Sequence, residues 1–164
     1  MRVCFVCLGN ICRSPAAEAV LRTMAAQQGV AVEVDSAGTA DFHVGELPHQ
    51  HTVAEARRRG YPVAHRGRQF EPGDFAAYDL VVALDTANEA DLLGLAPDED
   101  AAQKVVRLGA FVPGEQGPGA DVPDPWGLGP EAYQAMFDQV EQACSGLVGH
   151  VAAGTVPQVL GRRG

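Results

Sequence analysis

No segment of this 164-residue sequence approaches the ~20 consecutive apolar residues that a membrane-spanning helix needs. The apolar run at the N-terminus is also too short for the core of a signal peptide. Basic residues are few, 12 against 21 acidic residues, and the formal net charge of −9 argues against a nucleic-acid clamp or a protein that binds anionic membranes. We therefore expect a cytoplasmic protein that binds neither nucleic acid nor a membrane.

The composition excludes disorder, since 46% of the residues are hydrophobic and 20% are charged. The sequence contains no internal repeat, and its length fits one domain. We expect a single domain over residues 1–164, with an ordered core from about residue 2 to about residue 150 and a flexible tail at 155–164.

Only four cysteines are present, and in a reducing compartment cysteines are more often free, catalytic or metal-bound than paired in a disulfide framework. Three of them, Cys4, Cys7 and Cys12, fall within nine positions. A structural zinc site needs four well-placed ligands, and the sequence has no second paired motif to join Cys4 and Cys7. We therefore expect no metal and interpret Cys4 as a core residue of a strand.

Short β-prone segments alternate with helical patterns along the chain, which is typical of an α/β fold with a parallel sheet. Strands are predicted at residues 3–6, 30–34, 80–84 and 105–108. Helices are predicted to begin where the sequence offers an N-cap, a capping box or a proline, at Ser14, Thr52, Thr86 and Pro130.

Residues 113–130 are too rich in proline and glycine for the interior of a helix or strand, so they predict a long loop. Long loops in compact domains are often functional. The segment 127–132 matches the dinucleotide-binding pattern G-x-G-x-x-A, but no strand precedes it, and we reject that interpretation.

The most informative segment runs from Cys7 to Arg13, between the first strand and the first helix. A short loop that closes on a helix N-terminus can turn successive backbone N–H groups inward and form a nest for a tetrahedral oxyanion. Gly9 and Asn10 tolerate the left-handed backbone that such a loop needs. The guanidinium of Arg13 can hold two phosphate oxygens at once. This pattern predicts a phosphate-binding loop.

A cysteine at the base of this nest has a chemical use. The inward N–H groups favour the thiolate of Cys7, to which Ser14 can donate its hydroxyl. A thiolate that faces a phosphate attacks phosphorus in line and forms a phosphocysteine, which water then hydrolyses. The alternative interpretation, that Cys7 and Cys12 are small buried hydrophobic residues, explains less of the strand, loop and Ser-Pro context.

Residues 6–15 resemble the active-site loop of the cysteine-based low-molecular-weight protein tyrosine phosphatases. The resemblance extends from residue 2 to about residue 148 through four further motifs in the family's order, Asp35-Ser36-Ala37-Gly38-Thr39, His65-Arg66-Gly67-Arg68-Gln69, Leu84-Asp85 with Asn88, and Asp124-Pro125-Trp126. It implies a three-layer α/β/α fold, flavodoxin-like or Rossmann-like, in which helices flank a four-stranded parallel sheet of strand order 2-1-3-4.

The resemblance implies a hydrolase that converts phosphotyrosine to tyrosine and phosphate, with Cys7 as the nucleophile, Arg13 as the phosphate clamp and Asp124 as the general acid and base. The reaction needs such an acid because a phenolate leaves more easily when it is protonated. Without the resemblance, an aspartate before proline is more typical of a turn. The phosphate-binding loop would comprise Leu8, Gly9, Asn10, Ile11, Cys12 and Ser14.

The resemblance also assigns supporting roles. Asn10 and His65 would brace the loop through hydrogen bonds to Ser14, although His65 on its own could be an ordinary surface histidine. Cys12 would form a protective disulfide with Cys7 under oxidation. Many members carry an aspartate and an arginine in the segment 48–51, where this chain has Pro-His-Gln-His. The sequence therefore does not show whether this segment supports the phosphate-binding loop.

Aromatic walls at the mouth of a deep nest would select the long, flat ring of phosphotyrosine over phosphoserine. Phe42 and Trp126 are the candidates, the alternative being that they anchor their loops. Ile11 occupies a position where a related branch that removes phosphate from arginine typically carries threonine, which favours phosphotyrosine here. We expect phosphotyrosine-containing proteins as partners, phosphate or vanadate as ligands or inhibitors, and no cofactor.

Two other functions remain open. Arsenate reduction on the same fold begins from the same thiolate but needs a relay of cysteines, and none lies between Cys12 and Cys144. A module that binds phosphotyrosine without catalysis would keep the nest, but the presence of Cys7, Arg13 and Asp124 together argues against it.

Overall fold

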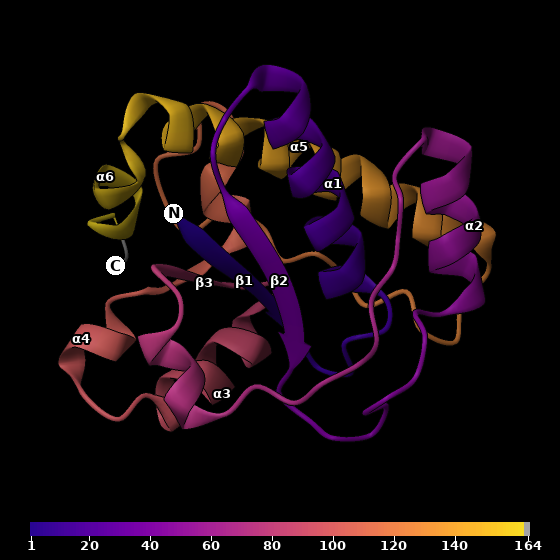
Figure 1. The fold of residues 1–164 in the computed structure, drawn as a ribbon, viewed down its shortest axis with the longest axis horizontal. Coiled ribbons are helices and arrows are strands. Elements are labelled where there is room, and N and C mark those ends of the chain that lie inside the picture. The colour runs from indigo at the N-terminus through magenta and orange to yellow at the C-terminus, as the bar shows by residue number, and fades with distance from the viewer. Residues whose placement is uncertain (163–164) are drawn as a thin grey trace.

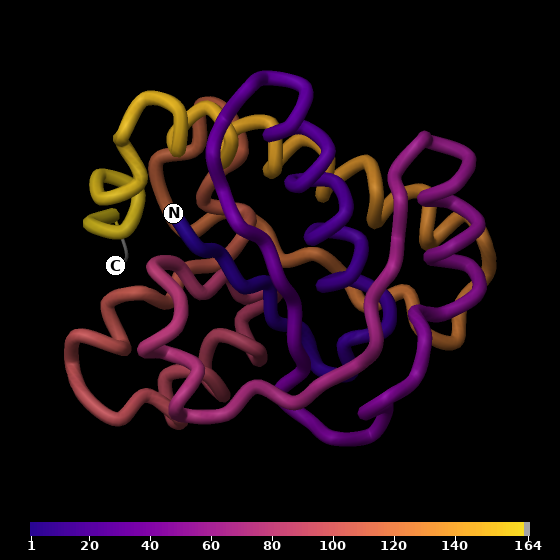
Figure 2. Tube along the Cα trace, viewed as in Figure 1, coloured from indigo at the N-terminus to yellow at the C-terminus, as the bar shows by residue number. Residues whose placement is uncertain are grey.

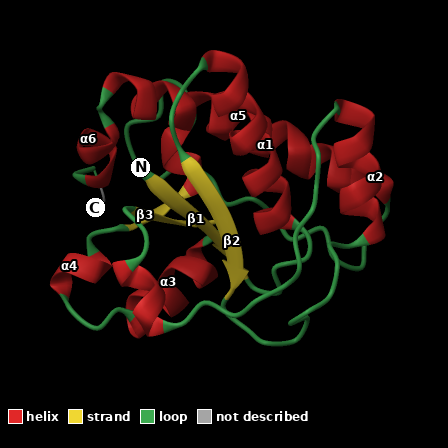
Figure 3. Ribbon diagram, viewed as in Figure 1, coloured by secondary structure: helices red, strands yellow, loops and turns green. Residues whose placement is uncertain are grey.

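A four-stranded parallel sheet lies at the centre of the protein, as a computed structural model describing residues 1–162 shows (Figures 1 and 3). Its strand order is β2-β1-β3-β4, and each neighbouring pair is parallel. The predicted α/β class, the parallel sheet and its 2-1-3-4 order are therefore confirmed. The strands are β1 Arg2–Cys7, β2 Glu33–Gly38, β3 Leu80–Ala83 and β4 Val105–Arg107.

Helices cover both faces of this sheet. Helices α1 and α5 pack on one face, α3, α4 and the 3-10 helix η1 lie on the other, and α2 packs beside α5 (Figure 1). The α-helices are α1 Arg13–Gln28, α2 Gln50–Arg59, α3 Thr86–Leu95, α4 Glu99–Ala102, α5 Pro130–Ala153 and α6 Val156–Leu160, and the 3-10 helices are η1 Pro72–Ala76 and η2 Leu108–Phe111.

Strand β1 is buried on both sides, as expected for a central parallel strand with helices on both faces. Because successive side chains of a strand point to opposite faces, Val3 and Phe5 join the apolar cluster under α1 and α5, whereas Cys4 and Val6 join the cluster under η1 and α3. Cys4 is fully buried, which confirms its interpretation as a core residue of a strand.

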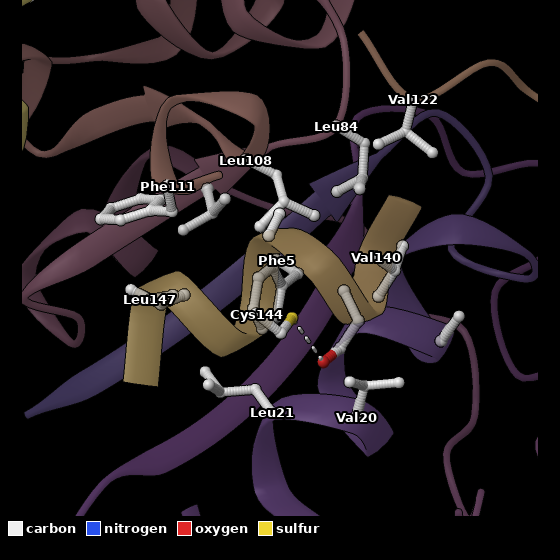
Figure 4. Packing of buried hydrophobic residues seen from close by; sticks show 14 of the residues in the cluster. Phe5, Val20, Leu21, Leu84, Leu108, Phe111, Val122, Val140, Cys144 and Leu147 are labelled. Atoms are coloured by element: carbon white, nitrogen blue, oxygen red, sulfur yellow. Dashed lines mark hydrogen bonds between the residues drawn. The ribbon is translucent and has the colours of Figure 1, made fainter. Parts of the chain in front are cut away.

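Helix α5 presents a long apolar face to the first of these clusters. Figure 4 shows Cys144 of α5 surrounded by side chains that include Phe5 of β1 and Leu21 of α1. The thiol contacts the carbonyl oxygen of Ala17 at 3.9 Å. Burial raises the pKa of Cys144, so this cysteine is a neutral core residue. Each large apolar side chain buried in this way stabilises the fold by about 1.5–3 kcal/mol.

After α2 the chain passes along the edge of β2 on its way to η1 (Figure 2). Gly38 at the end of β2 forms an isolated parallel bridge with Gln69, and the N–H of Phe70 donates to the carbonyl of Gly38 at 2.7 Å. This segment covers part of an otherwise open edge strand. It also brings His65 next to Ser36 of β2, with 3.4 Å between the imidazole Nε2 and the hydroxyl.

The second strand begins at Glu33, later than the predicted start at Val30. The N–H of Val30 donates to the carbonyl of Ala25 at 2.9 Å, so Val30 completes the C-terminal turn of α1 instead of entering the sheet. Gly29 ends this helix in the left-handed conformation, as the sequence predicts.

Three predicted N-cap residues lie inside their helices. The observed N-caps are Cys12 for α1, His49 for α2 and Asp85 for α3. The predicted residues are used elsewhere or buried: Ser14 contacts Cys7, Thr86 bonds to Asp121, and Thr52 is buried. Tertiary partners therefore decide which of several adjacent polar residues caps a helix.

The segment 155–164, expected as a flexible tail, begins with helix α6. Val156 and Val159 are three positions apart and both are buried against the core, which explains why this part of the chain is helical. Residues 163–164 lie outside the described residues. None of the helices within residues 1–162 combines the length and the apolar character of a membrane-spanning segment.

An ion-pair network joins α2 to α5. Glu55 binds Arg58 and Arg59, and Arg59 also pairs with Asp138 and Glu141 of α5 at 2.9 Å each. Hydrogen bonds from Arg58 and then Arg59 lower the pKa of Glu55 to about 2, against an ordinary value of 4.5.

We predict that Glu55→Gln lowers the free energy of unfolding by about 1–2 kcal/mol near neutral pH. A carboxyl whose pKa is lower in the folded state stabilises the fold above its unfolded pKa and loses this contribution as the pH falls toward the folded pKa. The difference between the two proteins should therefore shrink as the pH falls from 4.5 toward 2. Denaturant unfolding across that range measures it, with Glu33→Gln as the control, since the Arg2–Glu33 pair is exposed. A difference that does not change with pH would contradict the prediction.

Candidate active site

The loop between β1 and α1 lies at the carboxyl edge of the sheet and forms the floor of a pocket of about 270 Å³. Asn10 has a φ of 58°, the left-handed conformation that its residue type tolerates, and it turns the loop back toward Cys7. Helix α1 begins at Arg13, so its first N–H groups have no acceptor within the helix. The pocket is lined by Cys7, Leu8, Gly9, Ile11, Cys12, Arg13, Phe42, His43, Asp124 and Trp126.

Cys7 ends β1 and is only 3% exposed. Its sulfur accepts a hydrogen bond from the N–H of Asn10 at 3.3 Å and lies 3.0 Å from the hydroxyl of Ser14. Ser14 in turn accepts from the amide Nδ2 of Asn10 at 2.8 Å. A backbone N–H and a hydroxyl group thus contact the sulfur, and the hydroxyl also lies 3.3 Å from the carbonyl oxygen of Ala37.

The Asn10 side chain uses both ends of its amide. Its Nδ2 also donates to the Ser36 hydroxyl at 3.0 Å, and its Oδ1 accepts from the N–H of Arg68 at 3.0 Å and from His65 Nε2 at 2.7 Å. The predicted bracing role of Asn10 agrees with this geometry. His65 reaches Asn10 and Ser36, so it braces the loop through Asn10 and not through a bond to Ser14.

Glu18 and Ser36 lie behind Asn10, and neither residue had a predicted role. Glu18 Oε1 accepts from the Ser36 hydroxyl at 2.6 Å and lies 3.3 Å from His65 Nδ1. Burial lowers the pKa of His65, while the carboxylates of Glu18 and Asp35 act in the opposite direction. A signal existed in the position of Glu18, one helical turn after Ser14 on the same face of α1.

Ligand atoms of Glu18, Asp35 and His65 lie within 4.8 Å of one another, which is close enough for a shared cation. Their existing hydrogen bonds already explain this proximity. Asp35 accepts from the hydroxyl of Tyr78 at 2.7 Å, and Glu18 and His65 bond to Ser36 and Asn10 as described. We therefore assign this cluster to loop support.

Arg13 is a buried cation, 2% exposed, held at the edge of the pocket. Its Nη1 donates to Asp85 Oδ2 at 2.5 Å and to the carbonyl of Val122 at 3.0 Å. Burial alone would lower the pKa of Arg13, but the Cys7 sulfur, Asp85 and Asp124 raise it overall, so the guanidinium stays charged. Its buried Nε has no hydrogen-bond partner among the described residues.

Asp85 is the principal site residue without a predicted role. Its Oδ1 caps α3 by accepting from the N–H of Asn88 at 2.7 Å, and its Oδ2 binds Arg13. A single carboxylate thus fixes both a helix start and the guanidinium. The sequence signal is an aspartate directly after the buried run of β3, where carboxyl ends of neighbouring parallel strands meet.

Asp124 belongs to the predicted long loop, which connects η2 to α5. Its Oδ2 lies 3.7 Å from Arg13 Nη2, and its Oδ1 accepts from the N–H of Trp126 at 3.1 Å. The side chain is 42% exposed and opens onto the pocket. Phe42 and Trp126 line the same pocket and are largely exposed, as expected for walls of its mouth.

Cys12 is buried beside Cys7, and both are free thiols. Burial raises the pKa of Cys12 to about 11, and its sulfur lies 3.5 Å from the hydroxyl of Tyr133. The rings of His49 and His51 pack against Tyr133, and the N–H of His49 donates to the carbonyl of Ile11 at 2.8 Å. The segment 48–51 therefore supports the loop through backbone and ring contacts.

The arrangement can bind a tetrahedral anion and place a sulfur nucleophile beneath it. A Cys-x5-Arg loop at the carboxyl edge of a parallel sheet, with a charged arginine and a carboxylate across the pocket, defines the class to which this fold and site belong. This class comprises α/β proteins with an anion-binding loop built around a cysteine.

Comparison with known proteins narrows this class. The profile of the family described as low molecular weight phosphotyrosine protein phosphatase matches residues 2–156. A low molecular weight protein-tyrosine-phosphatase of Streptomyces coelicolor is 45% identical over 152 residues, which cover 92% of this chain and 93% of that relative. The chain therefore belongs to the low molecular weight phosphotyrosine protein phosphatase family, and it is a hydrolase.

Solved structures agree with this assignment. A protein tyrosine phosphatase from Entamoeba histolytica is similar with a TM-score of 0.88 at 34% identity, covering 95% of this chain and 99% of that chain. An arginine phosphatase is similar with a TM-score of 0.84 at 26% identity, covering 93% of this chain and 96% of that chain. The same fold thus accompanies two different phosphatase names.

We predict that Asn10→Gly lowers the free energy of unfolding by about 2–4 kcal/mol, because its buried hydrogen-bond partners are left unpaired while the left-handed backbone is still tolerated. Binding of inorganic phosphate should weaken at least tenfold, that is by about 1.4 kcal/mol. Denaturant unfolding and phosphate titration measure the two effects. Asn10→Ala should cost about 1 kcal/mol more through backbone strain. An unchanged phosphate affinity in the folded Asn10→Gly protein would contradict the bracing role.

Proposed function

We propose that this protein hydrolyses phosphotyrosine in proteins, with Cys7 as nucleophile, Arg13 as phosphate clamp and Asp124 as general acid and base. The observation that carries the proposal is the placement of three groups on one pocket. The Cys7 sulfur lies under the loop, the charged Arg13 has a free buried donor, and the Asp124 carboxylate lies 3.7 Å from that guanidinium.

In the first step the Cys7 thiolate attacks phosphorus, and a sulfur–phosphorus bond forms while the bond to the tyrosyl oxygen breaks. Asp124, protonated at this stage, gives its proton to the departing phenolate oxygen. The products are a phosphocysteine, free tyrosine on the substrate protein, and an ionised Asp124. N–H groups of the loop and the Arg13 guanidinium stabilise the charge on the three equatorial oxygens.

In the second step a water molecule attacks phosphorus, and the sulfur–phosphorus bond breaks. The Asp124 carboxylate takes a proton from that water, which restores the acid for the next cycle. Cys7 leaves as a thiolate, stabilised by the Asn10 N–H and the Ser14 hydroxyl that already contact its sulfur. The second product is inorganic phosphate.

Selection of phosphotyrosine is attributed to the depth of the pocket and to its mouth. Cys7 is almost fully buried, so only a long side chain brings its phosphate within reach of the sulfur. Phe42 and Trp126 offer aromatic walls for the ring. Ile11, also in the pocket, replaces the threonine typical of the arginine-directed branch, and the higher identity to the tyrosine phosphatases supports the same choice.

The purified protein should release phosphate from phosphotyrosine faster than from phosphoserine or phosphoarginine and should not reduce arsenate. Its remaining cysteines, Cys4 and Cys144, are fully buried and cannot serve as a relay. Cys7→Ser should abolish turnover, by a factor on the order of 10³ or more, while retaining phosphate or vanadate binding. A phosphate-release assay and a binding titration test both points. Unchanged turnover in Cys7→Ser would remove the mechanism, and arsenate reduction would favour the alternative function.

Asp124→Ala should slow hydrolysis of phenyl phosphate by about 10²-fold or more, since phenolate must then leave unprotonated. Hydrolysis of 2,4-dinitrophenyl phosphate should fall much less, because its leaving group is a weak base. The comparison uses kcat/KM on the two esters, because kcat/KM ends at departure of the leaving group and excludes the second step, in which Asp124 is the base. Equal losses on both would mean that another residue supplies the proton.

Peroxide should inactivate the protein reversibly through a disulfide between Cys7 and Cys12. The Cys7 thiolate is oxidised to a sulfenic acid, and the Cys12 thiol then displaces hydroxide as water. Peptide mass spectrometry should find this pair after oxidation, and a thiol reductant should restore activity. In Cys12→Ser the inactivation should become irreversible. Recovery of Cys7 in any other pairing, or unpaired, would defeat this proposal.

A further inference from the structure

Asp121 lies three residues before Asp124 in the same loop, and its carboxylate is bonded to two other elements of the fold. We propose that Asp121 is a positioning residue, which anchors the loop so that Asp124 stays beside Arg13 at the pocket. This inference rests on the role of Asp124 as general acid under the proposed function.

The side-chain contacts of Asp121 form a closed triangle. Its Oδ1 accepts from the Thr86 N–H at 3.1 Å, from the Thr86 hydroxyl at 2.9 Å and from Arg107 Nη1 at 3.0 Å. Arg107 Nη1 also donates to the Thr86 hydroxyl oxygen at 3.0 Å. Thr86 begins α3 and Arg107 ends β4, so one carboxylate holds the loop to two elements of the central layers.

The backbone next to Asp121 is joined to the active-site segment. The N–H of Val122 donates to the carbonyl of Leu84 at 2.9 Å, and the carbonyl of Val122 accepts from Arg13 Nη1 at 3.0 Å. Residues 84–86 and 121–122 therefore run together, and Asp85, between Leu84 and Thr86, is the other acceptor of Arg13.

The loop is also fixed just before Asp121. Gly119 has a φ of 72° and its backbone presses on Gly109 of η2, where a β-carbon added at Gly119 would lie 2.1 Å from the Gly109 carbonyl. No side chain other than hydrogen fits either position. The loop thus approaches the site from a close backbone contact, and Asp121 is the first residue after it with a charged attachment.

Within residues 1–162, the Asp124 carboxylate has only weak attachments. Its bond from the Trp126 N–H lies within the same loop, and its distance to Arg13 Nη2 is 3.7 Å. Only Pro123 separates Asp124 from the anchored Val122, and the fixed φ of proline transmits the position of one residue to the next. The placement of the Asp124 carboxyl is therefore set largely by what holds residues 121 and 122.

A purely structural role for Asp121 has different consequences. The Thr86 N–H is one of the unpaired donors at the start of α3, and satisfying it stabilises the helix. If this were all, loss of Asp121 would lower stability and reduce activity equally on every substrate. A positioning role slows departure of a leaving group that needs a proton, and it leaves substrate binding and the departure of a weakly basic leaving group unchanged.

The test compares kcat/KM, which ends at departure of the leaving group, for phenyl phosphate and 2,4-dinitrophenyl phosphate in the full chain and in Asp121→Ala, Asp124→Ala and the double variant. We expect Asp121→Ala to lower kcat/KM for phenyl phosphate by about tenfold or more, with kcat/KM for the dinitrophenyl ester nearly unchanged. In the Asp124→Ala background, Asp121→Ala should cause no further loss. Equal losses on both esters, a further loss in the double variant, or no change at all would overturn the proposal.

Thr86→Val and Thr86→Ser provide a second, milder comparison if Asp121→Ala folds poorly. Thr86→Ser keeps the hydroxyl that donates to Asp121 and should keep the original ratio of the rates on the two esters. Thr86→Val should change that ratio in the same direction as Asp121→Ala. Asp138→Ala, which removes an exposed carboxylate of α5, is the control and should leave both rates unchanged. If Asp124→Ala shows no difference between the esters, the general acid assignment fails. If Asp124→Ala affects the two esters differently, and neither Asp121→Ala nor Thr86→Val does so, only the positioning role fails.

Discussion

The active site depends on the hydrogen bonds of the Asn10 side-chain amide. A loop that directs its N–H groups toward an anion cannot satisfy them within regular secondary structure, so its shape must be imposed from behind. Asn10 does this with four partners on three separate segments, Ser14, Ser36, His65 and the backbone of Arg68. Because the bonds to Ser14 and Ser36 are buried and the other two are partly buried, they are costly to leave unmade and hold the loop in this conformation.

The buried charge of Arg13 is the second constraint. A guanidinium removed from water needs negative partners, and Asp85 and Asp124 come from two different loops at the carboxyl edge of the sheet. The same charge that would bind a phosphate dianion therefore holds together the segment that carries Asp124 and the N-terminus of α3. Net charge over the whole chain says little about this site, since one buried cation and backbone dipoles supply the attraction.

The local features of the site could be predicted from the sequence, and the tertiary ones could not. The spacing of the strand, loop and helix patterns predicted the parallel sheet and the placement of Cys7 and Arg13 at the two ends of the loop. These features depend on short-range patterns. The predicted caps at Ser14, Thr52 and Thr86 failed because their hydroxyls are used or buried by distant parts of the chain. Glu18 and Asp85 bind residues far along the sequence, so their positions in the pattern indicate a place near the loop but do not identify their partners. Asp124 required the family resemblance, since its local context is that of a turn.

The contact between Gly119 and Gly109 has a consequence for how this loop can vary. Neither glycine has room for a β-carbon, so the two backbones are in direct contact. Residues inserted between Gly119 and Asp121 would separate the loop from η2. Residues 114–118, just before this contact, are mostly exposed, and an insertion there leaves the contact between Gly119 and Gly109 in place. A peptide tag or a reporter group is therefore best grafted within 114–118, where the chain can extend outward without moving the Asp124 carboxylate.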